Sequence, residues 1–185
     1  MPTRSLVGRG SSLVVLIDLQ TNLLRHIDRA DTVVANGALL ARAAGLLGVP
    51  VIATTQNVDR LGDLAAGIQS ALPEEAAAPN KMAFSAARDP AVLDLIRNAG
   101  RSQIVIAGVE THICVAQTAI DLRAAGYDVT VVPDACSSRT TERHKLGMER
   151  IRDFGVLPAA AESVVYEWLE RAGTAEFRAI LPLVR

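Results

Sequence analysis

Three side chains that are far apart in the sequence could together perform nucleophilic catalysis. Asp18 directly follows the apolar run Leu13–Ile17 and would bring a carboxylate to the end of a strand. Lys81 follows a proline-rich connection, and Cys114 lies near the start of a helical pattern. A carboxylate can take the proton of a thiol, and a nearby cation lowers the pKa of that thiol. The three residue types can therefore form a cysteine nucleophile with its base.

Each of these residues also has an ordinary structural interpretation. An Asp after a strand is often a turn or cap residue, a lone Cys is usually a small buried hydrophobic residue, and a Lys is usually solvated. The position of Cys114 near a helix N-terminus favours the chemical interpretation, because the macrodipole and unpaired N–H groups there favour a thiolate and could bind an oxyanion. Lys81 becomes informative only beside Asp18 and Cys114.

The three histidines and the second cysteine are weaker candidates for catalysis or metal binding. His112 and Cys114 are two residues apart, and residues at that spacing on a helix do not face each other, so we expect no Cys–His dyad. His26 and His144 are predicted to lie on the surface, and Cys136 to pack near the rim of the site. Three scattered His and two distant Cys give no ligand spacing, so we expect no metal.

The elements that must position these residues follow from hydrophobic patterning. Runs that are apolar on both faces are typical of buried parallel strands; they are Leu13–Ile17, Val51–Thr54, Ile104–Ala107 and Val129–Val132, with a weaker run at Val156–Ala159. Helical spacing covers Thr32–Leu47, Pro90–Ala99, Cys114–Ala125, Thr140–Phe154 and Ser163–Ala172. This alternation predicts an α/β sandwich with a mostly parallel, doubly wound sheet. Ligands bind beyond the carboxyl ends of such strands, where Asp18 and Cys114 fall.

Composition excludes several classes of protein. The chain has 185 residues, of which 50% are hydrophobic, and we expect one domain over residues 1–185 with a core from about 11 to 172. Its 19 Lys and Arg nearly balance 20 Asp and Glu, which argues against disorder and against nucleic-acid or membrane partners. A small-molecule partner is expected. The segment Met1–Gly10 has no run typical of a signal peptide, so we expect a cytoplasmic location.

The sequence contains neither of two common nucleotide-binding motifs. The glycines of Gly8-Arg9-Gly10 precede the first strand, and no G-x-G-x-x-G opens the next helix, so a dinucleotide-binding turn is not predicted. No P-loop pattern is present either, and we expect no cofactor.

Taken in order, the chemical segments resemble the isochorismatase-like cysteine hydrolase superfamily, closest to the isochorismatase domain-containing hydrolases of unassigned substrate. The matching segments are Leu16–Gln20, Lys81–Ser85, Gly108–Val115, Ala116–Leu122, Asp134–Arg139 and Met148–Arg152. The resemblance covers the chain from about Leu13 onward. It implies a three-layer sandwich with a six-stranded sheet.

The resemblance also implies roles for individual residues. Cys114 would be the nucleophile, Asp18 the general base and acid, and Lys81 the cation that orients Asp18 and favours the thiolate. A cis peptide bond is implied before Glu110, whose N–H would form an oxyanion hole with that of Cys114. The residues expected near the substrate are Gln20, Gln56 and Thr111.

The sequence also departs from better-known branches of the superfamily. Nicotinamidases carry an Asp/His/His metal cluster where this chain reads Thr55–Asp59, which argues against the metal and that activity. Isochorismatases proper cleave a vinyl ether by acid catalysis and typically lack a nucleophilic Cys. The leading hypothesis is therefore hydrolysis of a C–N bond through a thioester. The alternatives are vinyl-ether hydrolysis with Asp18 as acid, and an idle scaffold on the same fold.

Two segments suggest self-association. The alanine-rich stretch Leu64–Ala78 is expected to form surface helix, and the apolar C-terminal segment Ile180–Val184 is expected to be exposed. Apolar surface of this kind usually has a partner, so a homo-oligomer is predicted.

Overall fold

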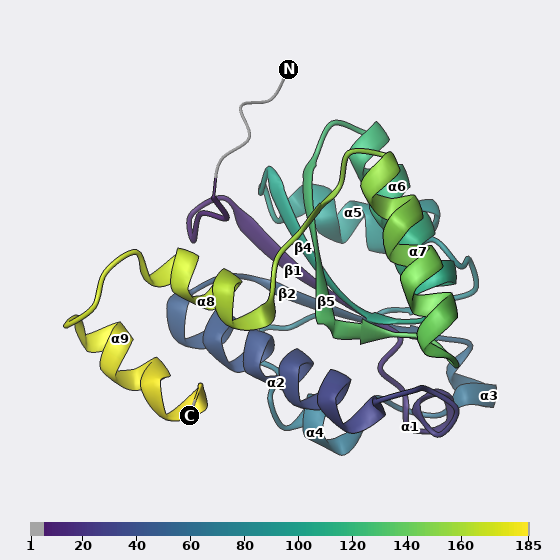
Figure 1. Cartoon of the computed structure of the whole chain (residues 1–185), viewed down its shortest axis with the longest axis horizontal. Coiled ribbons are helices and arrows are strands. Elements are labelled where there is room, and N and C mark those ends of the chain that lie inside the picture. Colours follow the sequence, from purple (N-terminus) through teal and green to yellow (C-terminus); the bar gives the residue numbers. More distant parts are fainter. Residues whose placement is uncertain (1–5, 185) are drawn as a thin grey trace.

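The computed structural model describes residues 6–184 and contains a parallel sheet with helices on both faces (Figure 1). Its six strands follow the order β3-β2-β1-β4-β5-β6, and every neighbouring pair is parallel. The predicted α/β sandwich is confirmed. Residues 1–5 and 185 of the predicted domain lie outside the described part of the chain.

The elements have the following bounds. The strands are β1 (Ser12–Ile17), β2 (Val51–Gln56), β3 (Asn80–Lys81), β4 (Gln103–Val109), β5 (Asp128–Ser137) and β6 (Leu157–Pro158). The α-helices are α1 (Thr21–Leu24), α2 (Ala30–Leu47), α3 (Val58–Leu61), α4 (Ala66–Gln69), α5 (Pro90–Asn98), α6 (Ala116–Ala124), α7 (Thr141–Asp153), α8 (Ala161–Leu169) and α9 (Ala175–Ile180). Two 3₁₀ helices, η1 (Ala86–Arg88) and η3 (Leu181–Leu183), and one π-helix, η2 (Thr111–Val115), complete them.

The central strand β1 belongs to two hydrophobic cores at once. Successive side chains of a strand point to opposite faces of the sheet. Val14 and Leu16 pack in the core that contains α2 and α8, whereas Leu13, Val15 and Ile17 pack in the core that contains α5, α6 and α7. All five are completely buried. The run is therefore apolar at every position, as a strand covered on both faces requires.

The nucleophile segment and β3 differ from the sequence prediction. The predicted helix over Cys114–Ala125 begins earlier, as the π-helix Thr111–Val115, and continues as α6. The proline-rich connection before Lys81 ends in β3, an edge strand of two residues that pairs Lys81 with Gln56. So short a strand has no apolar run, and periodicity could not reveal it.

Of the two segments expected at the surface, Leu64–Ala78 has many exposed residues, whereas most of Ile180–Val184 is at least partly buried. Leu64–Ala78 contains only one short helix, α4, and the stretch is otherwise irregular. At the C-terminus Ile180 is 1% exposed, while Leu183 and Val184 pack against the core beside α2. The predicted exposure is wrong for most of Ile180–Val184, because helix α9, which leads into this segment, packs against α2.

Candidate active site

The carboxyl ends of the strands bring together the three residues singled out in the sequence. Asp18 follows β1, Lys81 ends the edge strand β3, and Cys114 lies in η2 just after β4. Lys81 Nζ donates a hydrogen bond to Asp18 Oδ2 over 2.8 Å, and both side chains are fully buried. The Asp18 carboxylate also lies close enough to the Cys114 thiol for each group to shift the pKa of the other. Cys114, at 7% exposure, is the most accessible of the three.

An unusual backbone conformation turns Asp18 toward its partners. Its φ of 55° lies in the left-handed region, which is uncommon for residues other than glycine and is often found at functional sites. The Asp18 N–H donates to Thr54 O over 3.1 Å. The Thr54 hydroxyl donates to Oδ1 over 2.8 Å, so each carboxylate oxygen has a donor.

The Lys81 ammonium is surrounded by acceptors. Besides Asp18, it donates to Gln56 Oε1 over 2.7 Å and lies 3.2 Å from Ala83 O and 3.4 Å from Phe84 O. A buried charge is costly unless it is paired and hydrogen-bonded, and here it is both. Carbonyl groups of the loop after β3 thus hold the Lys81 ammonium in place beside Asp18.

The backbone around the nucleophile is unusually close to its neighbours. A Cβ on Gly108, whose φ is 132°, would lie 2.1 Å from Ile17 O, so only glycine lets β4 approach the end of β1 here. A Cβ on Gly147 would lie 2.8 Å from the His112 backbone, so α7 also packs directly on η2. The Val109–Glu110 peptide bond is cis.

Burial dominates the electrostatics of the site. The pKa of Cys114 is raised to about 12, mainly by burial and then by the Asp18 charge, while Lys81 and the Glu110 N–H act in the opposite direction. Burial also raises the pKa of Asp18, against the opposing effect of Lys81. The expectation of a thiolate favoured by the helix N-terminus is therefore wrong. The raised pKa favours a thiol, beside the carboxylate that could take its proton.

The predicted substrate contacts have other partners in this structure. Gln20 is fully buried, and its side chain bonds to the backbone of Gln56 and Gly62. Gln56 is half-buried and holds Lys81, while its amide nitrogen donates to Met82 O over 2.9 Å. Both glutamines thus lie in the shell that holds the lysine.

Thr111 belongs to a second polar cluster behind the nucleophile. Its hydroxyl lies 2.9 Å from His144 Nδ1, and His144 is buried, so the predicted surface position of that histidine is wrong. Glu110 accepts hydrogen bonds from the backbone N and from Nε of Arg139, over 2.9 and 3.1 Å. His112 Nδ1 lies 2.9 Å from Ser138 Oγ and does not contact Cys114.

Sequence reasoning missed Thr54, Thr118 and Arg139, which support the central residues. Thr118 is four residues after Cys114 and donates to its carbonyl oxygen over 2.7 Å. Helical spacing could have identified Thr118, because residues four apart share a helix face. Thr54 and Arg139 reach the site through strand pairing and loop packing, which local spacing does not encode.

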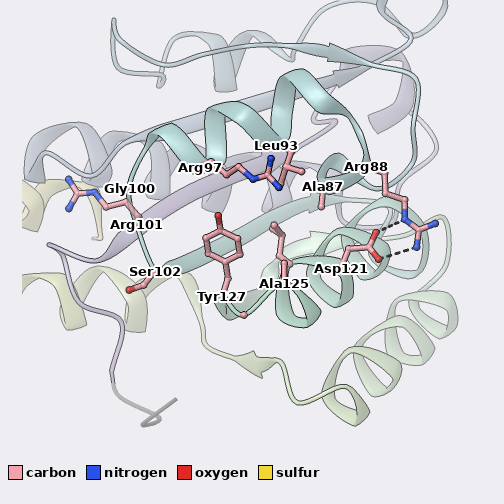
Figure 2. Close-up of a pocket in the computed structure, with 12 residues that line it drawn as sticks. Ala87, Arg88, Leu93, Arg97, Gly100, Arg101, Ser102, Asp121, Ala125 and Tyr127 are labelled. Atoms are coloured by element: carbon pink, nitrogen blue, oxygen red, sulfur yellow. Dashed lines mark hydrogen bonds and ion pairs between the residues drawn. The ribbon is translucent and has the colours of Figure 1, made fainter. Parts of the chain in front are cut away.

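A groove of about 630 Å³ lies elsewhere, between α5 and α6 (Figure 2). Arg88 and Asp121 form an ion pair at one end of it, and Tyr127 projects into it. Asp18, Lys81 and Cys114 are not among its lining residues, so it is distinct from the candidate active site.

Within residues 6–184, no group of three or more His, Cys, Asp and Glu side chains could hold a metal ion. In the same part of the chain, no helix combines the length and apolar character needed to cross a membrane.

Comparison with known proteins decides the family. The isochorismatase domain profile matches residues 12–163. The chain belongs to the isochorismatase family. Within the isochorismatase family it is similar to the secreted isochorismatase effector Isc1 of Phytophthora sojae (strain P6497). They are 35% identical over 178 residues, which cover 95% of this chain and 85% of the relative.

Other isochorismatase-family proteins extend the comparison. Isochorismatase domain-containing protein 2 of Bos taurus is 32% identical over 188 residues, covering 98% of this chain and 88% of the relative. The YcaC gene product of Escherichia coli, described as an octameric hydrolase of unknown specificity, has a TM-score of 0.90. It is 22% identical, and the match covers 99% of this chain and 92% of YcaC. The chain is thus placed among isochorismatase-like hydrolases, and the likeness to YcaC shows the shared fold.

Proposed function

We propose that this chain is a cysteine-dependent hydrolase that cleaves an amide-type C–N bond of a small molecule. The observation that carries the proposal is the position of the Asp18 carboxylate, which lies 2.8 Å from Lys81 Nζ and near enough to the Cys114 thiol to raise its pKa. A nucleophile, a base in contact with it and a cation that orients the base are the parts that covalent acyl transfer needs.

The first half of the reaction forms a thioester. Asp18 takes the proton of the Cys114 thiol as Sγ attacks the substrate carbonyl carbon, and the carbonyl oxygen becomes an oxyanion. The N–H groups of Glu110 and Cys114 stabilise that oxyanion; the Glu110 N–H is already placed to lower the pKa of the sulfur. The C–N bond then breaks, and the amine leaves with the proton that Asp18 returns.

The second half regenerates the enzyme. Asp18, again a carboxylate, takes a proton from water, and the hydroxide attacks the thioester carbon. The C–S bond breaks, the acid product leaves, and the proton on Asp18 returns to the Cys114 sulfur. Lys81 keeps its hydrogen bond to Asp18 throughout. Because the thiol has a raised pKa, sulfur attack depends on this proton transfer.

Release of ammonia from a panel of simple amides tests the proposal, with acetamide, benzamide and nicotinamide as probes. On any amide that wild type hydrolyses, Cys114→Ala and Asp18→Asn should lose activity, and mass spectrometry should detect an acyl group on Cys114. Full turnover by Cys114→Ala would refute covalent catalysis.

One observation favours a second candidate reaction. Burial raises the pKa of Asp18, which favours a protonated carboxyl that could protonate a vinyl ether, as isochorismate hydrolysis requires. This route needs Asp18 and not Cys114. Isochorismate offered to wild type and to Cys114→Ala separates the two: an equal rate in both selects the acid route, and no reaction excludes it.

The proposal extends to the assembly and the location of the protein. We propose a homo-oligomer, since the fold relative YcaC is octameric, and light scattering would measure the number of subunits. A cytoplasmic location is proposed as well, although a relative carries the name of a secreted effector. Fractionation of the source cells would decide this.

A further inference from the structure

One buried hydroxyl connects the segment that carries Lys81 to the turn that carries Cys114. Thr118, fully buried in α6, donates a hydrogen bond to Cys114 O over 2.7 Å. Its oxygen also accepts a hydrogen bond from the N–H of Ala86, over 2.9 Å. A hydroxyl has a single hydrogen to donate, so its donor is used on one segment and its acceptor on the other.

Ala86 ends the loop that holds the Lys81 ammonium. Lys81 Nζ lies 3.2 Å from Ala83 O and 3.4 Å from Phe84 O, which shortly precede Ala86 in the chain. At its other end the loop leaves β3, where Lys81 pairs with Gln56. The loop is therefore anchored at both ends, and the ammonium is held between the anchors.

An exposed ion pair joins the same two elements one turn further along α6 (Figure 2). In η1, Arg88 places its Nε 2.7 Å from Asp121 Oδ2 and its Nη2 3.0 Å from Oδ1, but its side chain is 69% exposed. Exposed ion pairs contribute little, because water screens them and ordering the side chains costs entropy. The bonds of Thr118 are shielded from water, so Thr118 is the stronger of the two connections.

We propose that Thr118 is a positioning residue that fixes the Lys81 ammonium relative to the Asp18–Cys114 pair. This inference rests on the proposed function, in which that ammonium controls the charge on the two reacting groups. Thr118 contacts no reacting side-chain atom and acts only through the main chain of the two segments it joins.

The direction in which loss of the Thr118 hydroxyl changes the alkylation rate of Cys114 distinguishes a positioning role from simple support of the fold. The charged groups that act on the Cys114 thiol are Asp18, which raises its pKa, and Lys81, which lowers it. If the loop relaxes and the ammonium retreats, the thiolate becomes rarer and alkylation slows. If the fold merely loosens, Cys114 becomes more exposed and alkylation accelerates.

The experiment measures alkylation of Cys114 by iodoacetamide at a fixed, mildly alkaline pH, with mass spectrometry of the modified peptide. Thr118→Val should slow alkylation by at least about threefold, which corresponds to the lower end of the interaction energies between neighbouring residues. Thr118→Ser keeps the hydroxyl and should restore the wild-type rate. The matched control is Ser12→Ala. Ser12 is also fully buried; its hydroxyl donates to Gly8 O and accepts from Trp168 Nε1, at the opposite end of β1. This control should alkylate at the wild-type rate.

A second measurement tests whether the effect passes through the lysine. In a Lys81→Met background, Thr118→Val should cause no further slowing, since the cation it positions is gone. An equal slowing in both backgrounds overturns the proposal, as does an unchanged or faster rate in Thr118→Val alone. If Thr118→Val does not fold, Thr118→Ala replaces it with the same expected outcomes.

Alkylation needs no turnover, so the two proposals can fail separately. A wild type that hydrolyses no amide, with slow alkylation in Thr118→Val, refutes the proposed function and leaves the positioning role intact. A wild type that hydrolyses amides, with normal alkylation in Thr118→Val, refutes the positioning role alone.

Discussion

The Lys81 ammonium lies 2.8 Å from the Asp18 carboxylate, although 63 residues separate the two in the sequence, and both side chains are excluded from solvent. Moving two charges out of water is costly, and their attraction repays the cost only when further hydrogen bonds satisfy both groups. Here Thr54 and Gln56 supply such bonds. The buried pair therefore depends on these further hydrogen bonds, and it lies where the chemistry is proposed.

Removing one partner of this pair should destabilise the protein strongly. Lys81→Met leaves a buried carboxylate without its cation, which we expect to cost about 3–5 kcal/mol of unfolding free energy. The double variant Asp18→Asn/Lys81→Met removes both charges and should recover part of the loss. Urea unfolding monitored by circular dichroism measures all three proteins. A single variant as stable as wild type would contradict the prediction.

The same variant should show a characteristic pH dependence. Lys81 lowers the pKa of Asp18, so without it that pKa rises further above the value in the unfolded chain. Between these two pKa values the folded state binds more protons than the unfolded state, and stability falls as pH rises. The deficit of Lys81→Met should thus be smaller in mild acid than at neutral pH. A deficit that grows on acidification would contradict this.

Alkylation of the wild type should report a protonated nucleophile. The pKa of Cys114 is raised to about 12, and below its pKa a thiol gains about tenfold more thiolate for each pH unit. Iodoacetamide labelling of Cys114 should therefore keep rising throughout the mildly alkaline range. Cys136, which is fully buried, is the internal control and should remain unlabelled. A rate that is already constant at neutral pH would indicate a preformed thiolate instead.

How much the sequence could predict differs between the fold and the site. Strands such as Leu13–Ile17 were predictable because they are apolar on both faces, and Asp18 and Cys114 could be singled out because they follow such runs. The short edge strand β3 has no such run, so the sequence pattern did not show why Lys81 reaches the site. The protonation state of Cys114 was not predictable, since it depends on burial, which outweighs the helix N-terminus. Nor was the partner of His144, because its burial depends on how closely α7 packs on η2 at Gly147.

Glycine at position 108 should be essential to the junction of β1 and β4. In Gly108→Ala the new Cβ would lie 2.1 Å from Ile17 O, a backbone atom that cannot rotate away. The combined clash and left-handed strain should cost at least about 1–3 kcal/mol. Gly48→Ala is the matched control, because Gly48 also has a positive φ of 68° but has no atom within 4 Å of the added Cβ. Thermal unfolding should show a clearly larger loss at position 108, and equal losses would mean that the clash is relieved.

The anchoring of Glu110 should depend on two donors of unequal importance. Arg139→Ala removes the bond from Nε but keeps the bond from the Arg139 backbone N–H, so the buried carboxylate retains one partner. We expect a loss of about 1 kcal/mol, typical of one hydrogen bond. Glu110→Ala loses both bonds and should be destabilised more, and Glu110→Gln, which keeps an acceptor, should lie between wild type and Glu110→Ala. Urea unfolding gives this order directly. If Arg139→Ala were the least stable of the three, the guanidinium would be the main anchor, since the backbone bond alone would then fail to hold the residue whose N–H faces the sulfur.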